Sequence, residues 1–382
     1  MFFLLKYKLH PEPSSFNFFF SYGMAVKKDH YRKLYIGFDV SSKKIEVYAR
    51  TADEDKGVSM QIENSKNSIK EFLEKLPSLK DTVIAMETGF DSPWMSDYVK
   101  SFGCEVLVSN ARDLQLIWGS TAKSDRRDAE MLARLACFDK KLLHPIVHAQ
   151  AQNRDDLCVI KARDTLVRTK IMLINTVRSL MRSHGTDVSE LTPENFAQKA
   201  PKILPAELRP ALEGLLCQLV SIKQEIKNYD RIIAKLCKKY PETEKIRQVK
   251  GVGPITALAF CLVIGDPRRF GSKERLASYL GLTPKRDQSG EIDKQLGITK
   301  HGNTFVRRYL IQGANYILGH FGEDCDLRTF GMRIAARGGK IAKKKATVAV
   351  ARKLSGVIYA LWQSDVAYDP HYKENHQKKQ VA

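Results

Sequence analysis

YIGFDV, residues 35–40, is the first stretch of this chain that has the pattern of a β-strand, and it decides how the fold is read. Its residues are mostly apolar, but Asp39 places a carboxylate near its end. A carboxylate in such a strand is costly to bury unless a cation or hydrogen-bond donors meet it. Asp39 is therefore the first candidate functional residue.

Strand and helix patterns alternate regularly on the C-terminal side of this stretch. IEVYAR and VSMQIE continue the strand pattern, and Ile69, Phe72, Leu73 and Leu76 then repeat at helical spacing before Pro77. The order is three strands, helix, strand, helix, strand, helix, at residues 35–40, 45–50, 58–63, 69–76, 82–87, 92–102, 105–109 and 124–137. This is the element order of an RNase H-like α/β fold.

The rest of the chain has mainly helical patterns. Apolar residues alternate by four and three over residues 206–240, which is typical of a coiled coil, and residues 157–181 form a second, basic helix. We expect a helical hairpin, and the sequence leaves open whether its seam pairs with the other arm or with a second copy. Past Pro241 we expect a turn and buried helix from GVGP (251–254), a short helix at 272–280, a polar loop at 281–291 and a basic helix at 303–318. A glycine-broken loop that starts at Arg337 and a final helix that carries Arg352 and Lys353 should follow.

These patterns predict an α/β plus α protein with five segments. Residues 1–30 are unpatterned, and Met24, just before the basic entry to the first strand, is the expected start of the functional protein. The predicted segments are an extension at 1–30, the RNase H-like domain at 31–148, a helical coiled-coil region at 149–243, a mainly helical domain with a helix-hairpin-helix-like segment at 244–368, and a polar, disordered tail at 369–382.

The charge balance points to a polyanionic partner. Lys and Arg number 63 against 43 Asp and Glu, a formal net charge of +20. Because lysines and arginines placed on phosphates release condensed counterions, nucleic acid is the first candidate and an anionic membrane surface the second. Seven scattered cysteines without a C-x-x-C pair favour a reducing cytoplasm over zinc ribbons or disulfides. No apolar run is long enough to span a bilayer, and the N-terminus lacks a signal-peptide pattern.

Three further carboxylates complete a pattern with Asp39. Glu87 ends the apolar strand TVIAME, and Asp125 and Asp128 lie three apart on a predicted helix, so they share a face. Each feature alone is more often a cap, a surface ion pair or a solvated face. Strand-end acids gather at one edge of an open α/β sheet, and a hard divalent cation is the simplest compensation for their repulsion.

GFDVS, AMETG and KSDRRDAEMLA together resemble the carboxylate set of the insertion-sequence 110/1111 transposases, whose first domain is similar to the RuvC resolvase. The resemblance implies that Asp39, Glu87, Asp125 and Asp128 bind magnesium, where two metal ions would stabilise the attacking and leaving oxygens of a phosphodiester. It extends over nearly all of residues 33–365. The acids and the QSG loop are its specific parts.

The second half, from GVGPITALAFCLVIGD through QSG to ITKHGNTFVRRYLIQGA, resembles the second domain of that family. The resemblance implies that Ser289, before Gly290, is the nucleophile; most serines in such loops only form turns, and Ser272 and Ser278 are the alternatives. GVGP could present N–H groups to phosphate or be an ordinary turn. The candidate nucleic-acid contacts are basic side chains that would position the phosphate backbone without reading sequence, namely Arg307, Arg308, Lys340, Lys343, Lys344 and Lys345.

The resemblance also implies partners. They are donor and target DNA, a structured bridge RNA that pairs with both, and a homo-oligomer, a dimer or tetramer, whose active site combines serine and carboxylates from different protomers. The expected activity is that of a DNA transposase, a site-specific recombinase. The alternatives are a RuvC-like magnesium-dependent nuclease without a covalent intermediate and a non-catalytic DNA-binding protein. An actin-like ATPase or sugar kinase is a further alternative, but the glycine-rich nucleotide-binding loops that this class needs do not appear in the sequence.

Overall fold

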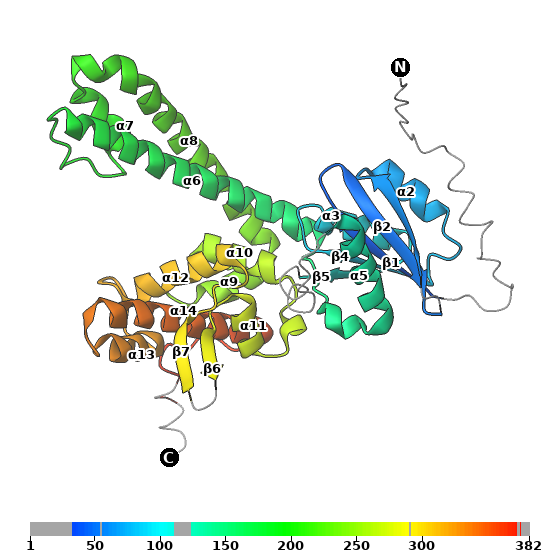
Figure 1. The fold of residues 1–382 in the computed structure, drawn as a ribbon. Coiled ribbons are helices and arrows are strands. Elements are labelled where there is room, and N and C mark those ends of the chain that lie inside the picture. Colours follow the sequence, from blue (N-terminus) through cyan, green and yellow to red (C-terminus); the bar gives the residue numbers. More distant parts are fainter. Residues whose placement is uncertain (1–32, 54–55, 111–123, 290–291, 373–374, 376–382) are drawn as a thin grey trace, which may run out of the picture. The chain divides into compact units, whose positions relative to one another are not determined.

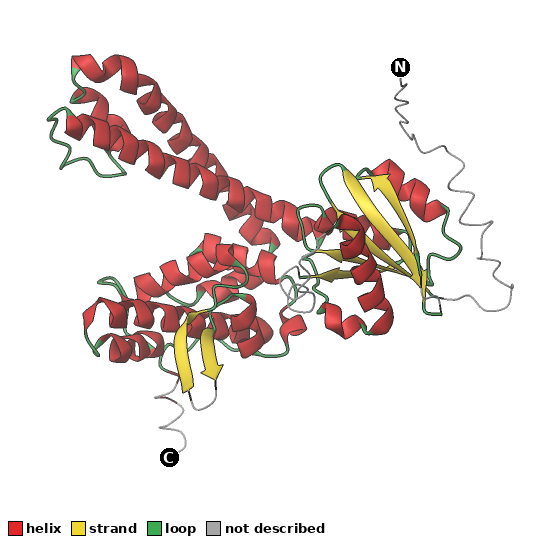
Figure 2. Ribbon diagram, in the orientation of Figure 1, coloured by secondary structure: helices red, strands yellow, loops and turns green. Residues whose placement is uncertain are grey.

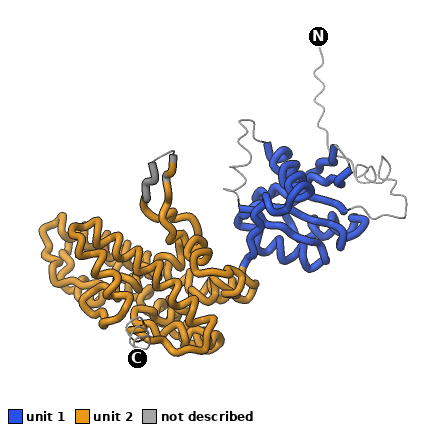
Figure 3. Tube along the Cα trace, turned by 90° about the horizontal axis from the view of Figure 1, so that it is seen from below, with its two compact units in different colours: residues 1–148 blue, residues 149–382 orange. Residues whose placement is uncertain are grey.

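The computed structural model describes residues 33–53, 56–110, 124–289, 292–372 and 375. The predicted extension at 1–30, the Met24 start and most of the polar tail lie outside these residues. The chain divides into two compact units, residues 1–148 and 149–382 (Figure 3). No helix in the described ranges is long and apolar enough to cross a membrane.

The first unit is built on a five-stranded mixed sheet of order β3-β2-β1-β4-β5 (Figure 1). β1 is antiparallel to β2 and β2 to β3, whereas β1, β4 and β5 run parallel. The α/β prediction for this unit is confirmed, and the arrangement is compatible with an RNase H-like domain. The strands are β1 (Leu34–Val40), β2 (Lys44–Thr51), β3 (Val58–Glu63), β4 (Thr82–Glu87) and β5 (Glu105–Ser109).

Helices cover both faces of this sheet. Ile84 and Met86 of β4 pack with α2 (Lys66–Glu74) and α3 (Ser92–Ser101). Val83 and Ala85, which point the other way, pack with α5 (Asp125–Phe138). Because neighbouring residues of a strand face opposite sides, a continuous apolar run such as TVIAM is what a strand buried on both faces requires.

α5 lies unusually close to β1, at Gly37. A Cβ atom added to Gly37 would lie 1.9 Å from the carbonyl oxygen of Ala129. Real Cβ atoms do not approach an oxygen this closely, and the obstacle is backbone, which cannot rotate away as a side chain can. Gly37 therefore sets the distance between the strand that carries Asp39 and the helix that carries Asp125 and Asp128.

The second unit contains the predicted helical hairpin. α6 (Ala151–Ser183) and α8 (Arg209–Lys239) pack antiparallel (Figure 2). Ion pairs join Lys239 to Asp156 and Arg163 to Asp230. The seam of α8 thus pairs with the other arm of its own chain. Its two ends are buried in separate apolar clusters, while Ile222, Ile226 and Tyr229 in the middle are only half-buried.

The remaining helices surround a second large core. α10 is buried along almost its whole length, as its apolar sequence predicts, and packs with α6, α8, α9 and α12. The first unit also contains η2 (Lys140–Leu143). The further elements of the second unit are α7 (Phe196–Lys199), η3 (Ala200–Lys202), η4 (Ala206–Leu208), α9 (Glu242–Arg247), α10 (Pro254–Ile264), η5 (Pro267–Phe270), α11 (Lys273–Tyr279), α12 (Thr304–Leu318), α13 (Asp326–Ala335) and α14 (Gly339–Gln363).

The prediction of a polar loop at residues 281–291 is wrong. Residues Pro284–Ser289 form β6, which pairs antiparallel with β7 (Ile292–Ile298) as a two-stranded ribbon. PKRDQS has no alternation of apolar and polar residues, so the period-two pattern that marks a half-buried strand does not reveal it. The final helix also begins earlier than predicted, at Gly339, so its lysines are helical.

We expect Gly37→Ala to lower the free energy of unfolding by at least ~2 kcal/mol, because the new methyl group meets a backbone carbonyl in a packed layer. Chemical denaturation checks this value. Gly89→Ala is the matched control: nothing lies within 4 Å of its added Cβ, so the change should stay within ~0.5 kcal/mol. Equal stability of the two variants would contradict the role given to Gly37.

Candidate active site

The two strand-end acids lie at one edge of the sheet. Asp39 is the next-to-last residue of β1, and Glu87 is the last residue of β4. β1 and β4 are parallel neighbours, so their carboxyl ends meet at the same edge, where open α/β sheets place their ligands. Both side chains are half-buried.

The other two predicted acids lie in the first turn of α5. Ser124 caps the helix, and its Oγ accepts a hydrogen bond from the backbone N–H of Arg127 (3.4 Å). Asp125 and Asp128 follow at the positive end of the helix dipole, a position that favours negative charge. Because Ala129 lies against Gly37, this turn is held beside β1.

The pKa of Asp39 shows that the four acids act on one another. Burial raises this pKa first, and the charges of Asp128, Asp125 and Glu87 raise it further, to about 6. Like charges that close disfavour each other's ionised form. The other three predicted carboxylates are therefore near enough to act on Asp39 through their charges.

Two residues that the sequence reasoning missed also belong to this site. Glu46 lies opposite Asp39 in the register of β1 and β2, and its charge also raises the pKa of Asp39. Lys44 lies between acids, with its Nζ 3.4 Å from an oxygen of Glu46 and 3.4 Å from an oxygen of Asp125. Only the pairing of β2 with β1 reveals them, because neither residue interrupts an apolar run.

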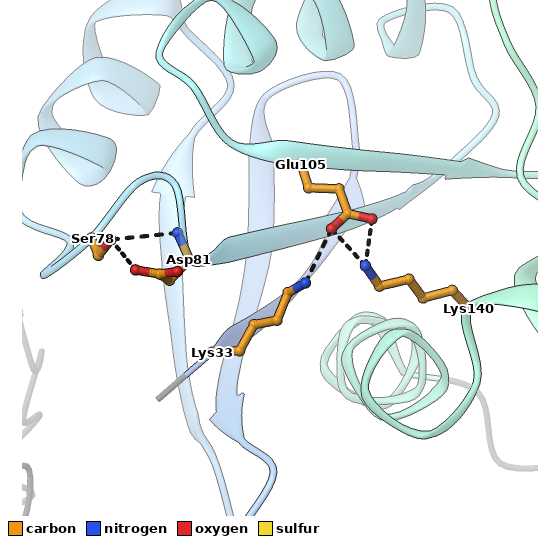
Figure 4. Close-up of polar contacts among 5 residues, drawn as sticks. All are labelled: Lys33, Ser78, Asp81, Glu105 and Lys140. Atoms are coloured by element: carbon orange, nitrogen blue, oxygen red, sulfur yellow. Dashed lines mark hydrogen bonds and ion pairs between the residues drawn. The ribbon is translucent and has the colours of Figure 1, made fainter. Parts of the chain in front are cut away.

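The other end of the same strands provides a contrast. Glu105, the first residue of β5, forms ion pairs with Lys33 (3.3 Å) and Lys140 (Figure 4). Burial alone would raise the pKa of Glu105, but the two lysines outweigh it and hold the pKa below its usual value. Two cations thus compensate one acid there, whereas the charges that shift the pKa of Asp39 are those of further acids, Asp128, Asp125, Glu87 and Glu46.

The donors around Asp39 are all carboxylates, the ligands preferred by hard divalent cations. Among the described residues, no three His, Cys, Asp or Glu side chains are close enough to hold a metal ion as they stand. Small side-chain movements toward a cation would be favoured, because they would relieve the mutual repulsion that raises the pKa of Asp39. The chemistry of these side chains thus suits a hard divalent cation, and their positions would have to change for them to hold one.

Ser289 belongs to the other unit. It is the last residue of β6, and its backbone pairs with Ile292 of β7. Residues 290–291 and the side chain of Ser289 lie outside what the structure describes. Of the alternative serines, Ser272 is the N-cap of α11, where its Oγ accepts from the backbone N–H of Arg275 (3.2 Å), and Ser278 is exposed on that helix.

The two arginines of α12 are held within the protein. Arg307 is 7% exposed and donates to the carbonyl oxygen of Leu280 (2.9 Å) and to Oγ1 of Thr304 (2.9 Å). Arg308 pairs with Asp164 of α6 at 2.7 Å and stacks over aromatic rings of its own helix. These contacts give both arginines a structural role.

The four predicted lysines are exposed near the start of α14, as the pattern of burial on that helix requires. Ala342 and Ala346, four residues apart, are buried, which leaves the lysines on the solvent side. Lys340, in the first turn, also lies where the helix dipole disfavours positive charge. A bound anion would relieve this arrangement. The four residues are Lys340, Lys343, Lys344 and Lys345.

Family models and known relatives match both units. A model described as "Transposase", for the DEDD transposases of IS110 type, matches residues 36–185. A second, described as "Transposase IS116/IS110/IS902 family", matches residues 243–325. Together they cover more than half of the chain and include all four acids and Ser289. The class of protein is thus a DNA transposase.

Comparison with known relatives narrows the class to one family of transposases. The transposase for insertion sequence element IS1111A of Coxiella burnetii is 28% identical over 64% of this chain and 68% of its own length. A probable family 20 transposase of Pseudomonas aeruginosa is 24% identical over 88% of this chain and 98% of its own. The pilin gene-inverting protein of Moraxella lacunata is 27% identical over 67% and 71%. The chain belongs to the IS110/IS1111 family of insertion-sequence transposases.

We expect Asp39→Asn to stabilise the protein in EDTA at about pH 8 by ~1–2 kcal/mol, after allowance for solvent screening. The folded protein holds this proton to a higher pH than the unfolded chain does, so Asp39 costs stability as the pH rises from about 4 through about 6. Denaturant unfolding across this range measures it. Glu71→Gln, on the exposed side of α2, is the control. A difference from wild type that does not grow with pH would refute the explanation.

Proposed function

We propose that this transposase cleaves and exchanges DNA strands in a magnesium-dependent reaction in which Ser289 is the nucleophile. The proposal rests above all on the carboxylates around Asp39, where burial and the charges of the other three predicted acids raise the pKa of Asp39. An anionic substrate such as DNA would be repelled by this cluster unless a metal ion came between them.

The carboxylates would supply the metal site. Asp39 and Glu87 are fixed by the sheet, and Asp125 and Asp128 by the first turn of α5, so the ligands belong to rigid elements. Magnesium, when bound, would neutralise these acids and stabilise charge on the attacking and leaving oxygens of a phosphodiester. Lys44, which pairs with Asp125, would have to release it as the cation enters.

The serine would supply the covalent step. Attack by Oγ of Ser289 would form a bond to phosphorus and break one phosphorus–oxygen ester bond, so the strand end would stay attached to the protein. The serine proton would pass to a base, and the departing oxygen would take up a proton to become a hydroxyl. This hydroxyl, or the hydroxyl of another strand, would then attack the phosphorus of the phosphoserine. That step would rejoin DNA and release the serine.

The positive charge would hold the nucleic acids. The exposed lysines of α14 are suited to phosphate contacts, and the net charge of +20 gives the whole chain attraction for polyanions. Contacts of this kind do not read sequence. We propose that a structured bridge RNA, pairing with donor and target DNA, selects the sites, so that the protein needs mainly backbone contacts.

The carboxylates and Ser289 belong to different compact units. We propose that the active site is completed in a homo-oligomer, where the serine of one protomer meets the carboxylates of another. The half-buried middle of α8, at Ile222, Ile226 and Tyr229, offers apolar surface for pairing two such hairpins.

We expect Asp125→Asn to lower magnesium-dependent strand cleavage by more than ~100-fold while leaving stability unchanged or slightly higher. The remaining acids lose a repulsive neighbour, and the lost ion pair with Lys44 is exposed and contributes little. Cleavage of transposon-end DNA and thermal unfolding are measured in parallel, with Glu71→Gln as the control. A variant with full cleavage in magnesium would remove Asp125 from the site.

A shared active site predicts complementation. Asp39→Ala and Ser289→Ala proteins should each be inactive, and an equal mixture assembled together should recover activity at about a quarter of its sites, because random pairing gives one intact site in half of the dimers. Recombination of end-bearing DNA is the measurement. No recovery at any mixing ratio would mean that each site is built within one chain.

Trapped complexes test the nucleophile directly. Wild-type protein should yield DNA joined to the Ser289 peptide, which mass spectrometry can identify, and Ser289→Ala should yield none. Ser278→Ala, an exposed serine in the same unit, should behave like wild type. Adducts that persist in Ser289→Ala would assign the covalent step to another residue.

A further inference from the structure

A fully exposed aromatic ring lies directly after the acid-bearing strand β4. Phe90 follows Glu87, Thr88 and Gly89, and its side chain is as accessible as in an extended chain. The neighbouring aromatic residues Trp94 and Tyr98 pack against the core of the unit instead. The ring of Phe90 therefore takes no part in the packing of this core.

The backbone on both sides of Phe90 is held firmly. The N–H of Thr88 donates to the carbonyl oxygen of Ser109 (2.8 Å), which ties the loop to β5. Ser92 Oγ accepts from the N–H of Gly89 (3.2 Å) and donates to the carbonyl oxygen of the same residue (3.1 Å). An exposed ring on such a loop is presented to solvent in a defined place.

Asp91, the residue after Phe90, adds two side-chain contacts. Its carboxylate accepts from Nε1 of Trp94 (2.9 Å) and from Nδ2 of Asn64 (3.2 Å). The loop is thus joined to α3 and to the segment after β3. Since the order of the loop does not depend on the ring of Phe90, replacing that ring should leave the fold intact.

Phe90 is within reach of whatever the acids bind. Three residues of chain span at most ~11 Å, so the Cα atoms of Phe90 and Glu87 are no further apart than this. Successive nucleotides of a strand are about 3.4 Å apart along a duplex. A strand with one phosphodiester at the acid cluster therefore has its neighbouring bases within range of the ring.

We infer that Phe90 stacks on a base of the DNA strand whose phosphodiester lies at the acid cluster, and so positions that strand. The inference rests on the proposed function, because it takes DNA as the ligand of the acids. Stacking on an aromatic ring tolerates any base. It would hold the strand in place without selecting its sequence.

The test uses the full chain with calcium in place of magnesium, so that binding is measured without cleavage. The probe is a fluorescein-labelled 30-nucleotide single strand with 5-iododeoxyuridine in place of thymidine, together with the matching duplex and RNA strands. Fluorescence anisotropy gives the affinity. Irradiation at the iodouridine absorption then joins the probe to aromatic rings stacked on it, and mass spectrometry locates the joined peptide.

The variants are Phe90→Ala, Phe90→Leu, Phe90→Trp and Phe138→Ala. Loss of the ring should weaken binding of DNA about tenfold, whereas tryptophan should preserve it. Phe138 is the matched control: it is 86% exposed and lies at the far end of α5 from Asp125, about 20 Å away at 1.5 Å per helical residue. Its replacement should leave affinity unchanged, and crosslinks should map to the Phe90 peptide.

Wild-type affinity in both Phe90→Ala and Phe90→Leu would overturn the inference, as would crosslinks that avoid Phe90. Weakening of the RNA probe alone would also overturn it, in favour of RNA as the stacked strand. Thermal unfolding of each variant shows that the fold is retained. The outcome is separable from the proposed function: cleavage by wild type with no effect of Phe90→Ala defeats the inference alone. If the wild-type protein does not cleave DNA but Phe90→Ala still weakens DNA binding tenfold, the proposed chemistry is defeated and the stacking contact stands.

Discussion

The contact between the backbones of Gly37 and Ala129 is the constraint on which the first unit depends. It fixes α5 at a short distance above β1, and thereby brings a turn that holds two aspartates to the strand end that holds a third. β4, parallel to β1, contributes Glu87 at the same edge. A helix placed further from the sheet could still bury its apolar face, but its first turn would be displaced from Asp39.

The energetic character of the site follows from this geometry. At the opposite end of the strands, Glu105 is matched by two lysines, as is usual for acids that only stabilise a fold. Asp39 and the acids around it come from three strands and a helix, and Lys44 pairs with two of them, Glu46 and Asp125. The arrangement lowers the stability of the empty protein, and sites of this kind are typical of function rather than of folding.

The order of elements in the first unit could be predicted because its apolar runs and helical spacings are strong local signals. The four acids could be predicted because they interrupt those signals at strand ends and a helix start. Glu46 and Lys44 could not, since their place beside Asp39 results from strand pairing. The ribbon around Ser289 was missed because PKRDQS carries charged residues and has no alternation of apolar and polar positions. The structural contacts of Arg307 could not be predicted from the sequence, because burial of an arginine depends on tertiary packing.

The approach of α5 to β1 also governs when the site can exist. The residues in contact are far apart in the chain, and β4, β5 and α3 lie between them in sequence. Contacts between distant residues form only after the intervening loops have closed. A growing chain that has emerged from the ribosome only as far as β5 has the strands of the sheet but lacks the helix that supplies half of the carboxylates. The acid cluster therefore appears only when synthesis has passed α5, as one of the last features of this unit to form.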